Sequence, residues 1–288
     1  MKIYILPTEE KLRPEEQSWT YPKHSKKFGV EQDFLRFLQN NPVLLTEDPK
    51  AADWHYLGAY WTRWHVGHDF AKTGLEELQE AVNKVIIDDK KTFTICQYDD
   101  GPVVNIGNTV QFLASRKTAT GFDIPLLCTP HRIPFFKPHK KYLASFVGYA
   151  KTHEIRKGMI HELKNRDDIL IFDGNQGSRY FVKTTLQSYI ALAPRGYGGS
   201  SFRFFEAMQM GIVPFLIGEP DTRPFKEYIP YDDFSLYTND PEKITELLNS
   251  KTKDELIKMG KGARKMYKKQ LAYQKWCPLV LKKLSTIK

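Results

Sequence analysis

Residues 193–219 place an arginine, three glycines and two serines directly before a short amphipathic run that holds a second arginine and a glutamate. Arg195 and Arg203 are permanently charged and offer paired N–H donors to phosphate oxygens. Glu206 lies about one helical turn further on and is suited to accept hydrogen bonds from a ribose diol. These residue types predict a site for a nucleoside diphosphate, built from Arg195, Gly196, Ser200, Ser201, Arg203 and Glu206.

A strand, a turn and a helix must position these side chains. Residues 188–194 form a β-rich run, Ser200 or Ser201 is a suitable helix N-cap, and Gly211 is a suitable stop for a helix over 201–210. The glycines of the turn let backbone amides approach a ligand closely. The helix start adds unpaired N–H groups and a partial positive charge, which together favour phosphate.

A plainer interpretation of the same stretch remains open. A glycine-rich turn before a helix is common, and this one matches neither the Walker loop nor GxGxxG. Arg203 and Glu206 would then form an ordinary surface pair three residues apart, worth a few tenths of a kcal/mol.

The wider pattern alternates short β-rich runs with helical periodicity, which is typical of βαβ units around a parallel sheet. A proline-rich and basic segment near residue 140 separates two such series. We expect an α/β protein with two Rossmann-like domains facing each other across a cleft. The first would span residues 1–140, the second, with the predicted diphosphate site, would span 141–270, and a C-terminal helix at 271–288 would pack back on the first. The strands expected in the first domain lie at 2–7, 42–46, 53–60, 92–100, 110–115 and 124–129, with helices at 30–38 and 74–86 and a polar, proline-containing loop after the first strand.

Composition limits the compartment and the partners. The 288 residues are 41% hydrophobic and 27% charged, with a net charge of +9. No zinc-finger spacing, RNP motif or arginine-rich arm accompanies this charge, so nucleic acid is not expected as a partner. Cys96, Cys128 and Cys277 are far apart, without a CxxC pair, which favours a reducing compartment. The N-terminal apolar run is too short for a membrane anchor, so we expect a cytoplasmic protein without a membrane span.

Several segments resemble one known family. The run "LAPRGYGGSSFRFFEAMQMGIVPFLIGEP", continued by "RPFKEYIPYDDFSLY", is similar to the C-terminal signature of the exostosin glycosyltransferases, glycosyltransferase family 47. Upstream, "FGVEQDFLRFLQNNPVLLTEDPKAADWHYLGAYW" and "FVGYAKTHEIR" resemble other parts of the family. "YWTRWHVGHDF" resembles its "WNR..G.DH" segment, with Phe70 in place of the final histidine. The resemblance covers nearly the whole chain.

This resemblance implies a GT-B fold and an inverting transfer of a sugar from a nucleotide sugar, usually UDP-linked, to a glycan, with neither metal nor other cofactor. In this interpretation Arg156, on the first helix of the second domain, points into the cleft beside the diphosphate. The chain is short and carries no recognisable anchor or stem, and in this it resembles compact members from large algal viruses and bacteria. We therefore expect a viral xylosyltransferase.

An inverting transfer needs a base that removes the acceptor proton, and the first domain must supply it. Asp69 follows the third expected strand and matches the aspartate of the family's "G.DH" segment, so it ranks first. Asp100 and Asp99, at the end of the strand expected over 92–100, rank next. The pair Glu9 and Glu10 also follows a strand. Each of these carboxylates has a simpler explanation as a solvated loop residue or a helix cap.

Next to Asp69 lies an aromatic group that could hold the acceptor. Tyr60, Trp61 and Trp64, with His68, could form a platform on which sugar faces stack, although a partly buried cluster is equally consistent with the sequence. His65 and His68 lack a third ligand, and none of the adjacent acid pairs has the DxD spacing. No metal site is therefore expected.

Two other functions share these features. A nucleotide-sugar epimerase or dehydrogenase would need a dinucleotide fingerprint after the first strand, and "ILPTEEKLR" has none. A non-catalytic glycan-binding protein on the same fold would bind the ligands without releasing UDP. The sequence leaves the donor sugar, the acceptor and the oligomeric state open.

Overall fold

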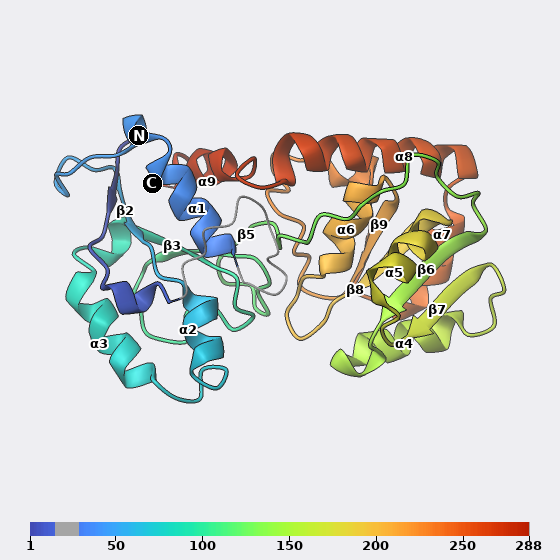
Figure 1. Ribbon diagram of the computed structural model, residues 1–288, viewed down its shortest axis with the longest axis horizontal. Helices are drawn as coiled ribbons and strands as arrows, with labels where there is room; N and C mark the ends of the chain where they lie inside the picture. Colours follow the sequence, from blue (N-terminus) through green and yellow to red (C-terminus); the bar gives the residue numbers. More distant parts are fainter. Residues whose placement is uncertain (15–28, 288) are drawn as a thin grey trace. The chain divides into compact units, whose positions relative to one another are not determined.

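The computed structural model describes residues 1–14 and 29–287, which form two parallel β-sheets with helices packed on them (Figure 1). The chain divides into a first unit, Met1–Leu127 with Tyr273–Lys288, and a second unit, Cys128–Ala272. The fold class is therefore α/β with two Rossmann-like domains, as the sequence pattern predicts. The loop expected after the first strand falls largely on residues 15–28, outside the described residues.

The first sheet has the strand order β1-β2-β3-β4-β5, with every neighbouring pair parallel. Its strands are β1 (Ile3–Ile5), β2 (Trp54–Leu57), β3 (Thr92–Cys96), β4 (Val110–Leu113) and β5 (Phe122–Asp123). Two expected strands are wrong. Pro42–Leu44 forms a 3-10 turn that begins at its proline, and only Leu45 bridges to β1. Residues 124–129 follow the last strand and form no ladder of their own.

Both faces of the first sheet carry helices because successive residues of β2 point to opposite sides. Leu57 packs in a cluster with residues of α2 (Trp61–Gly67) and α3 (Leu75–Val85). Tyr56 faces α1 (Val30–Gln39), where the Phe34 ring lies 5.2 Å from the Tyr56 ring and 5.7 Å from the indole of Trp276. Trp276 directly precedes α9 (Cys277–Leu284), so the C-terminal segment packs on α1.

The second sheet has the order β10-β9-β8-β6-β7, again parallel throughout. Its strands are β6 (Tyr142–Gly148), β7 (Ile169–Asp173), β8 (Ser188–Pro194), β9 (Val213–Ile217) and β10 (Leu236–Thr238). From β6 the chain first moves to β7 on one side and then returns to β8 on the other. The carboxyl ends of β6 and β8 therefore flank a topological switch point, where open α/β sheets bind ligands.

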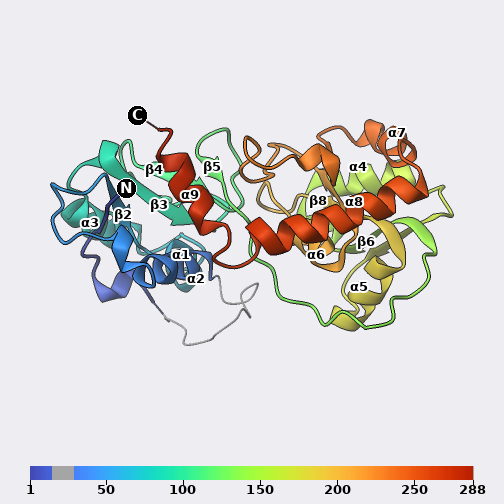
Figure 2. The same cartoon turned by 90° about the horizontal axis from the view of Figure 1, so that it is seen from above.

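Helices α4 to α8 accompany the second sheet (Figures 1 and 2). One buried cluster joins the sheet to the α4, α7 and α8 side, and another joins it to α5 and α6. The helices are α4 (Glu154–Leu163), α5 (Gly177–Leu186), α6 (Phe202–Met210), α7 (Ile244–Asn249) and α8 (Lys253–Met266), which continues as a π-helical turn, Tyr267–Leu271. None of the helices in the described ranges has the length and apolar character to cross a bilayer.

The first boundary between the units lies earlier in the chain than the expected residue 140. Residues 128–140 group with the second unit because polar side chains tie them to it. Lys137 Nζ donates to Met210 O at 3.4 Å, Lys140 Nζ donates to Ser188 O, and Gln209 Nε2 lies 2.9 Å from Cys128 Sγ. Residues 128–140, called the strap below, are therefore attached to the second unit and do not form a linker between the units.

Candidate functional site

The glycine-rich turn lies where the sequence places it, between the end of β8 and the start of α6. Ser201 is the N-cap residue of α6, and Gly211 ends this helix with a positive φ of 73°. The Ser201 side chain accepts no hydrogen bond from the helix, so the first-turn N–H groups have no side-chain cap. Ser200 and Ser201 are both buried.

Hydrogen bonds to the segment that follows β9 hold the turn in place. Arg195 Nε donates to Gly198 O at 3.2 Å, and the same guanidinium donates to Glu219 O. Thr222 Oγ1 donates to Gly199 O at 3.1 Å. Gly218 has a φ of 135°, and a Cβ there would stand 2.7 Å from Arg195 Cγ, so only glycine lets the arginine lie across this backbone.

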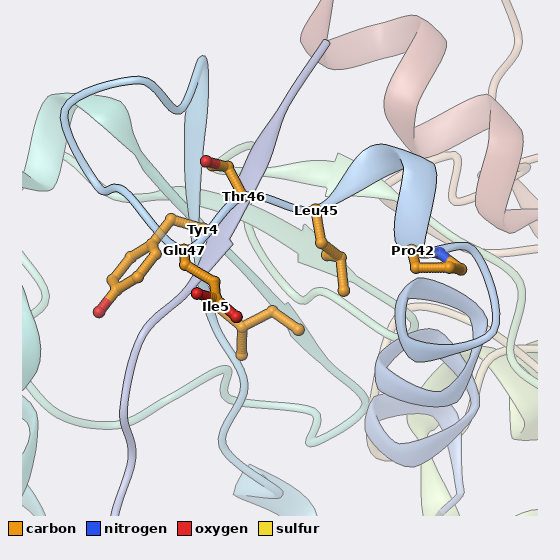
Figure 3. A pocket seen from close by; sticks show the side chains of 6 residues that line it. All are labelled: Tyr4, Ile5, Pro42, Leu45, Thr46 and Glu47. Carbon is orange, nitrogen blue, oxygen red and sulfur yellow. The ribbon is translucent and has the colours of Figure 1, made fainter.

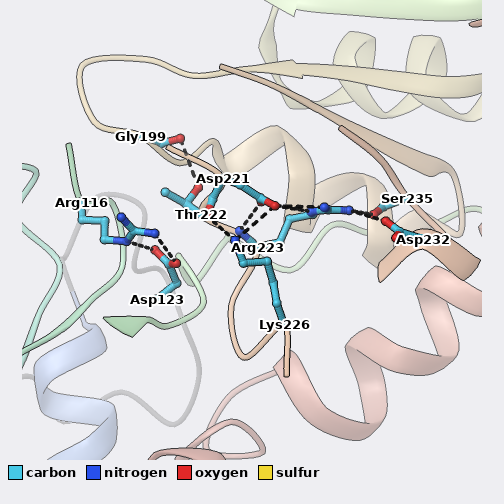
Figure 4. A network of polar contacts seen from close by, with 9 residues as sticks. All are labelled: Arg116, Asp123, Gly199, Asp221, Thr222, Arg223, Lys226, Asp232 and Ser235. Carbon is cyan, nitrogen blue, oxygen red and sulfur yellow. Dashed lines mark hydrogen bonds and ion pairs between the residues drawn. The ribbon is translucent and has the colours of Figure 1, made fainter. Parts of the chain in front are cut away.

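The segment after β9 is itself fixed by the ion-pair network in Figure 4. Arg223 pairs with Asp221 at 2.9 Å and with Asp232 at 3.1 Å, and its guanidinium also donates to Ser235 Oγ. Lys226 adds a second cation 3.2 Å from Asp221. This network explains what the "RPFKEYIPYDDFSLY" run contributes: it fixes the segment that supports the turn.

Arg156 joins the two strand ends at the switch point. It lies on α4, and its Nε donates to Arg195 O at 2.8 Å, one terminal nitrogen to Tyr149 O at 2.8 Å and the other to Pro194 O at 3.0 Å. Burial and the nearby Arg203 charge lower the pKa of Arg156 to about 10, which leaves it charged at neutral pH. Among the described residues no carboxylate lies within ion-pair distance of it. A bound anion would supply the missing counter-charge.

Arg203 lies on the first turn of α6 and completes this cationic group. Its Nε donates to Val147 O near the end of β6 at 3.0 Å, and its guanidinium stacks 4.1 Å from the Phe181 ring centroid. One terminal nitrogen contacts Glu206 Oε2 at 2.5 Å. About a third of the side chain, 32%, is exposed, so Arg203 can reach a ligand without leaving its partners.

Glu206 is buried and has a second partner that the sequence did not indicate. His131 Nε2 lies 2.8 Å from Glu206 Oε1, and His131 Nδ1 lies 3.3 Å from Ser178 Oγ. Burial opposes the ionised carboxylate, but the Arg203 charge and the His131 hydrogen bond outweigh it and lower the pKa of Glu206. Only 8% of the Glu206 side chain is exposed, so little of its carboxylate is accessible to a ribose diol.

Gly196 follows Arg195, and its Cα faces the Arg156 guanidinium: a Cβ there would lie 3.4 Å from the Arg156 terminal nitrogen. The structure therefore brings together Arg156, Arg195, Gly196, Ser200, Ser201, Arg203 and Glu206 around the ends of β6 and β8. Most of the guanidinium hydrogen bonds go to backbone carbonyls, so these arginines also fix the shape of the site that they charge.

Asp69, the first-ranked base, follows helix α2 and not a strand, because residues 61–67 are helical. Its side chain is 63% exposed and lies 3.2 Å from Lys72 Nζ. Asp69, Phe70 and Ala71 all have positive φ values, between 50° and 63°. Three consecutive left-handed residues without glycine are sparsely populated and store strain.

Asp99 and Asp100 lie in the turn after β3, at the carboxyl end of the first sheet. Asp100 pairs with Lys117 Nζ at 2.6 Å and remains about half exposed. Asp99 is partly buried. Both positions are consistent with the strand-end placement that the sequence indicates.

The aromatic group beside Asp69 is not an exposed platform. Trp61 is fully buried and its indole N–H donates to Thr94 Oγ1 at 2.8 Å inside the core, and Tyr60 and Trp64 are also buried. His68 stacks on Trp64 with ring centroids 4.1 Å apart. Helix α2 turns these rings toward the sheet, so the plainer alternative, a buried cluster, describes Tyr60, Trp61 and Trp64.

A buried carboxylate near these candidates escaped the sequence analysis. Glu31, on the first turn of α1, is fully buried, and its Oε1 accepts from Thr62 Oγ1 at 2.7 Å and from the backbone N–H of Gln97 at 3.0 Å. Its Oε2 has no partner among the described residues, and burial raises the pKa of Glu31. Its place on an amphipathic helix gave no hint of this, because Thr62 and Gln97 are distant in the sequence.

One cavity of the first unit shares no residue with these candidates. It measures about 600 Å³ and lies along the edge strand β1, lined by Tyr4, Ile5, Pro42, Leu45, Thr46 and Glu47 (Figure 3). Within residues 1–14 and 29–287, no group of three His, Cys, Asp or Glu side chains is placed to hold a metal ion.

The Exostosin GT47 domain model matches residues 64–251, about two thirds of the chain. The chain belongs to the exostosin GT47 family. The match includes Asp69, Arg156 and the whole turn from Arg195 to Glu206, whereas Glu31, Tyr60 and Trp61 precede it. This exostosin-family protein is therefore a glycosyltransferase.

Curated relatives agree with this assignment. The chain is 23% identical to the exostosin-1 homolog of Caenorhabditis elegans, over 92% of this chain and 80% of that protein. It is 30% identical to exostosin-1 of Drosophila melanogaster, over 36% of this chain and 17% of that one. It is also 27% identical to a probable glycosyltransferase of Arabidopsis thaliana, over 43% of this chain and 27% of the relative.

Solved structures resemble the exostosin-family chain only distantly. A glycosyltransferase from Rickettsia africae is 11% identical with a TM-score of 0.38, covering 99% of this chain and 97% of that one. AviGT4, a glycosyltransferase of avilamycin A biosynthesis, is 10% identical with a TM-score of 0.40, covering 99% and 97%.

Proposed function

We propose that this glycosyltransferase moves a sugar from a UDP-sugar to a glycan hydroxyl with inversion and without a metal ion, and that xylose is the sugar. The observation that carries the proposal is the pair of guanidinium groups, Arg156 and Arg203, at the switch point of the second sheet. Arg156 has no carboxylate partner among the described residues, and the uncapped start of α6 lies beside it.

A diphosphate fits this arrangement chemically. During transfer the acceptor oxygen bonds to the anomeric carbon, the bond from that carbon to the phosphate oxygen breaks, and negative charge grows on the departing UDP. Fixed cations and helix N–H groups at that position stabilise the charge without having to reorganise. Arg156 and Arg203 are fixed in this sense, because backbone carbonyls hold both guanidinium groups.

Inversion in one step requires a base that takes the proton from the acceptor hydroxyl on the opposite side of the sugar. Asp69 is the leading candidate, since it is exposed, pairs with Lys72 as its one side-chain partner among the described residues, and lies in a strained left-handed turn. Asp100 and Asp99 are the alternatives. The choice of xylose rests on the resemblance to compact members of the family.

A thermal-shift panel of UDP-, GDP- and CMP-sugars tests the donor class directly. A ligand that binds only the folded chain raises the unfolding temperature in proportion to RT ln(1 + [L]/Kd). We expect UDP-xylose to give the largest shift, and UDP release to require an added glycan acceptor. Stabilisation by GDP- or CMP-sugars alone would reject the UDP assignment. Binding without any UDP release across a panel of acceptors would indicate a glycan-binding protein instead.

A further inference from the structure

Two consecutive phenylalanines are presented to solvent on the strap of the second unit. Phe135 and Phe136 are 93% and 86% exposed, and their rings meet edge to face at 5.0 Å. Pro134 and Pro138 flank the three residues 135–137, and proline restricts the backbone on both sides. Two adjacent aromatic side chains this exposed are unusual on the surface of a globular protein.

The strap is attached to the second unit on both sides of the pair. Before it, His131 bonds to Glu206, and partly buried Ile133 packs against a core cluster. After it, Lys137 and Lys140 donate to backbone carbonyls of Met210 and Ser188. The rings are therefore held outward by an anchored segment.

Lys137 connects the pair to a group of cations that have no acidic partners among the described residues. Lys137 follows it directly and lies near Lys261 and Arg264 of α8; burial and these two charges lower the pKa of Lys137. Among the described residues, none of these three side chains has an ion pair. Lys265 on α8 and Lys268 in the π-helical turn after it are exposed.

We propose that Phe135, Phe136, Lys137, Lys261 and Arg264, the Phe–Lys surface, dock the protein on an anionic lipid bilayer. Aromatic rings settle at the headgroup level of a membrane, and nearby lysines and arginines are attracted to anionic headgroups. The surface lies at the C-terminal end of α6, where Lys137 contacts Met210, whereas the diphosphate site lies at the N-terminal end of that helix. The proposal is therefore independent of the donor site.

A protein partner fits this surface less well. A stable protein interface buries about 800 Å² on each side around an apolar centre. Two rings of roughly 150–250 Å² each fall short of that, and the cationic rim supplies no further apolar area. A bilayer has no such minimum, because single rings insert separately and each cation adds its own attraction.

Flotation of the full chain with vesicles of phosphatidylcholine, with and without phosphatidylserine, tests the proposal in the absence of nucleotide sugars. We expect flotation with the phosphatidylserine vesicles and loss of it at high salt. The double variant Phe135→Ala/Phe136→Ala should lower the partition coefficient at least about tenfold. Lys137→Glu and Lys261→Glu should each lower it about fivefold or more.

Matched controls lie in the first unit. Ile87→Ala removes another exposed apolar side chain, and Lys84→Glu makes the same charge change on α3. Both controls should float like the unmodified chain. Equal flotation of the phenylalanine variant, equal binding to neutral vesicles, or binding only to a single-stranded oligonucleotide under the same conditions would overturn the membrane assignment.

Discussion

Arg156 and Arg203 illustrate how single residues at the site serve two purposes. Arg156 donates three hydrogen bonds to backbone carbonyls at the ends of β6 and β8. Arg203 donates one to a carbonyl of β6, and it contacts Glu206, which also contacts His131. A guanidinium has five N–H donors, so both retain capacity for a ligand. Lysine at either position would keep the charge and lose this bridging geometry.

The first prediction at this scale concerns UDP affinity. Arg203→Ala should weaken UDP binding by an amount on the order of 2 to 5 kcal/mol, because it removes a partly desolvated cation from the proposed diphosphate site. Glu206→Gln keeps the shape of the side chain but removes the charge that orients Arg203, so it should also weaken binding. Calorimetric titration with UDP measures both effects.

The control for these variants is Arg166→Ala, which removes a partly exposed arginine that pairs with Asp168 in the turn between α4 and β7. It should leave UDP affinity unchanged. If Arg203→Ala and Glu206→Gln both bound UDP as tightly as the unmodified chain, the diphosphate assignment would be wrong and the pair would be structural.

The second prediction concerns the base. Asp69→Asn keeps the size of the side chain and removes its ability to accept a proton, so turnover should fall by roughly 10²–10⁴-fold while UDP affinity persists. The measurement is UDP release at saturating donor and acceptor. Asp99→Asn and Asp100→Asn serve as comparisons, since a carboxylate that only faces water should cost little turnover. Near-normal turnover in Asp69→Asn beside an inactive Asp99 or Asp100 variant would move the base to the end of β3.

At the scale of elements, helix α1 organises the first unit through a buried carboxylate, Glu31, and a partly buried one, Asp33. Glu31, at the start of α1, accepts hydrogen bonds from the backbone N–H of Thr62 at the start of α2 and of Gln97 directly after β3. Asp33 accepts from the backbone N–H of Gln274 at 2.9 Å and from the Trp276 indole at 3.1 Å, and so holds the C-terminal segment. Burial raises the pKa of Asp33 from 3.8 to about 6, although both hydrogen bonds oppose this shift.

This raised pKa gives a stability prediction with a definite sign. Between pH 3.8 and about 6 the folded chain keeps a proton on Asp33 that the unfolded chain has lost, so stability falls as the pH rises through this window. A shift of about two units corresponds to about 3 kcal/mol. Asp33→Asn should remove this dependence and be at least as stable as the unmodified chain at pH 7.

Urea unfolding at pH 4 and pH 7 measures the effect, with Asp33→Ala as the control. Asparagine still accepts the hydrogen bonds from Gln274 and Trp276, whereas alanine cannot, so the alanine variant should be less stable at both pH values. A variant Asp33→Asn that is clearly less stable than the unmodified chain at pH 7 would show that the ionised carboxylate is the stabilising form.

For the whole molecule, the two sheets offer different candidate groups near their carboxyl edges. In the first unit Asp99 and Asp100 lie there, with Glu31 buried beside them. In the second unit Arg156 and Arg203 lie there. The candidate bases Asp99 and Asp100 and the cations of the proposed diphosphate site therefore belong to different units.

The last prediction follows from the cations. If Arg156, Arg203 and the start of α6 neutralise the departing UDP, turnover should be the same with and without an excess of EDTA. UDP release after dialysis against the chelator measures this, and added Mn²⁺ or Mg²⁺ is the control. Loss of activity in EDTA with recovery on adding manganese would contradict metal independence.

How far the sequence alone could go is clearest at the turn after β8. Local preferences suffice there: an apolar strand, an N-cap serine and a glycine with positive φ predicted the positions of β8, α6 and Gly211 correctly. The alternation of strands and helices likewise predicted the α/β class. These features depend on residues within a few positions of one another, so the sequence is sufficient to predict them.

Only the tertiary structure decided the partners of the buried polar groups. His131 and Glu206 are 75 residues apart in the sequence, and Glu31 and Gln97 are 66 apart. Local sequence patterns therefore cannot predict either contact. The burial of Trp61 and the attachment of residues 128–140 to the second unit were decided in the same way. Burial depends on which faces of distant elements meet, and a periodic pattern shows that a face is apolar without showing what covers it.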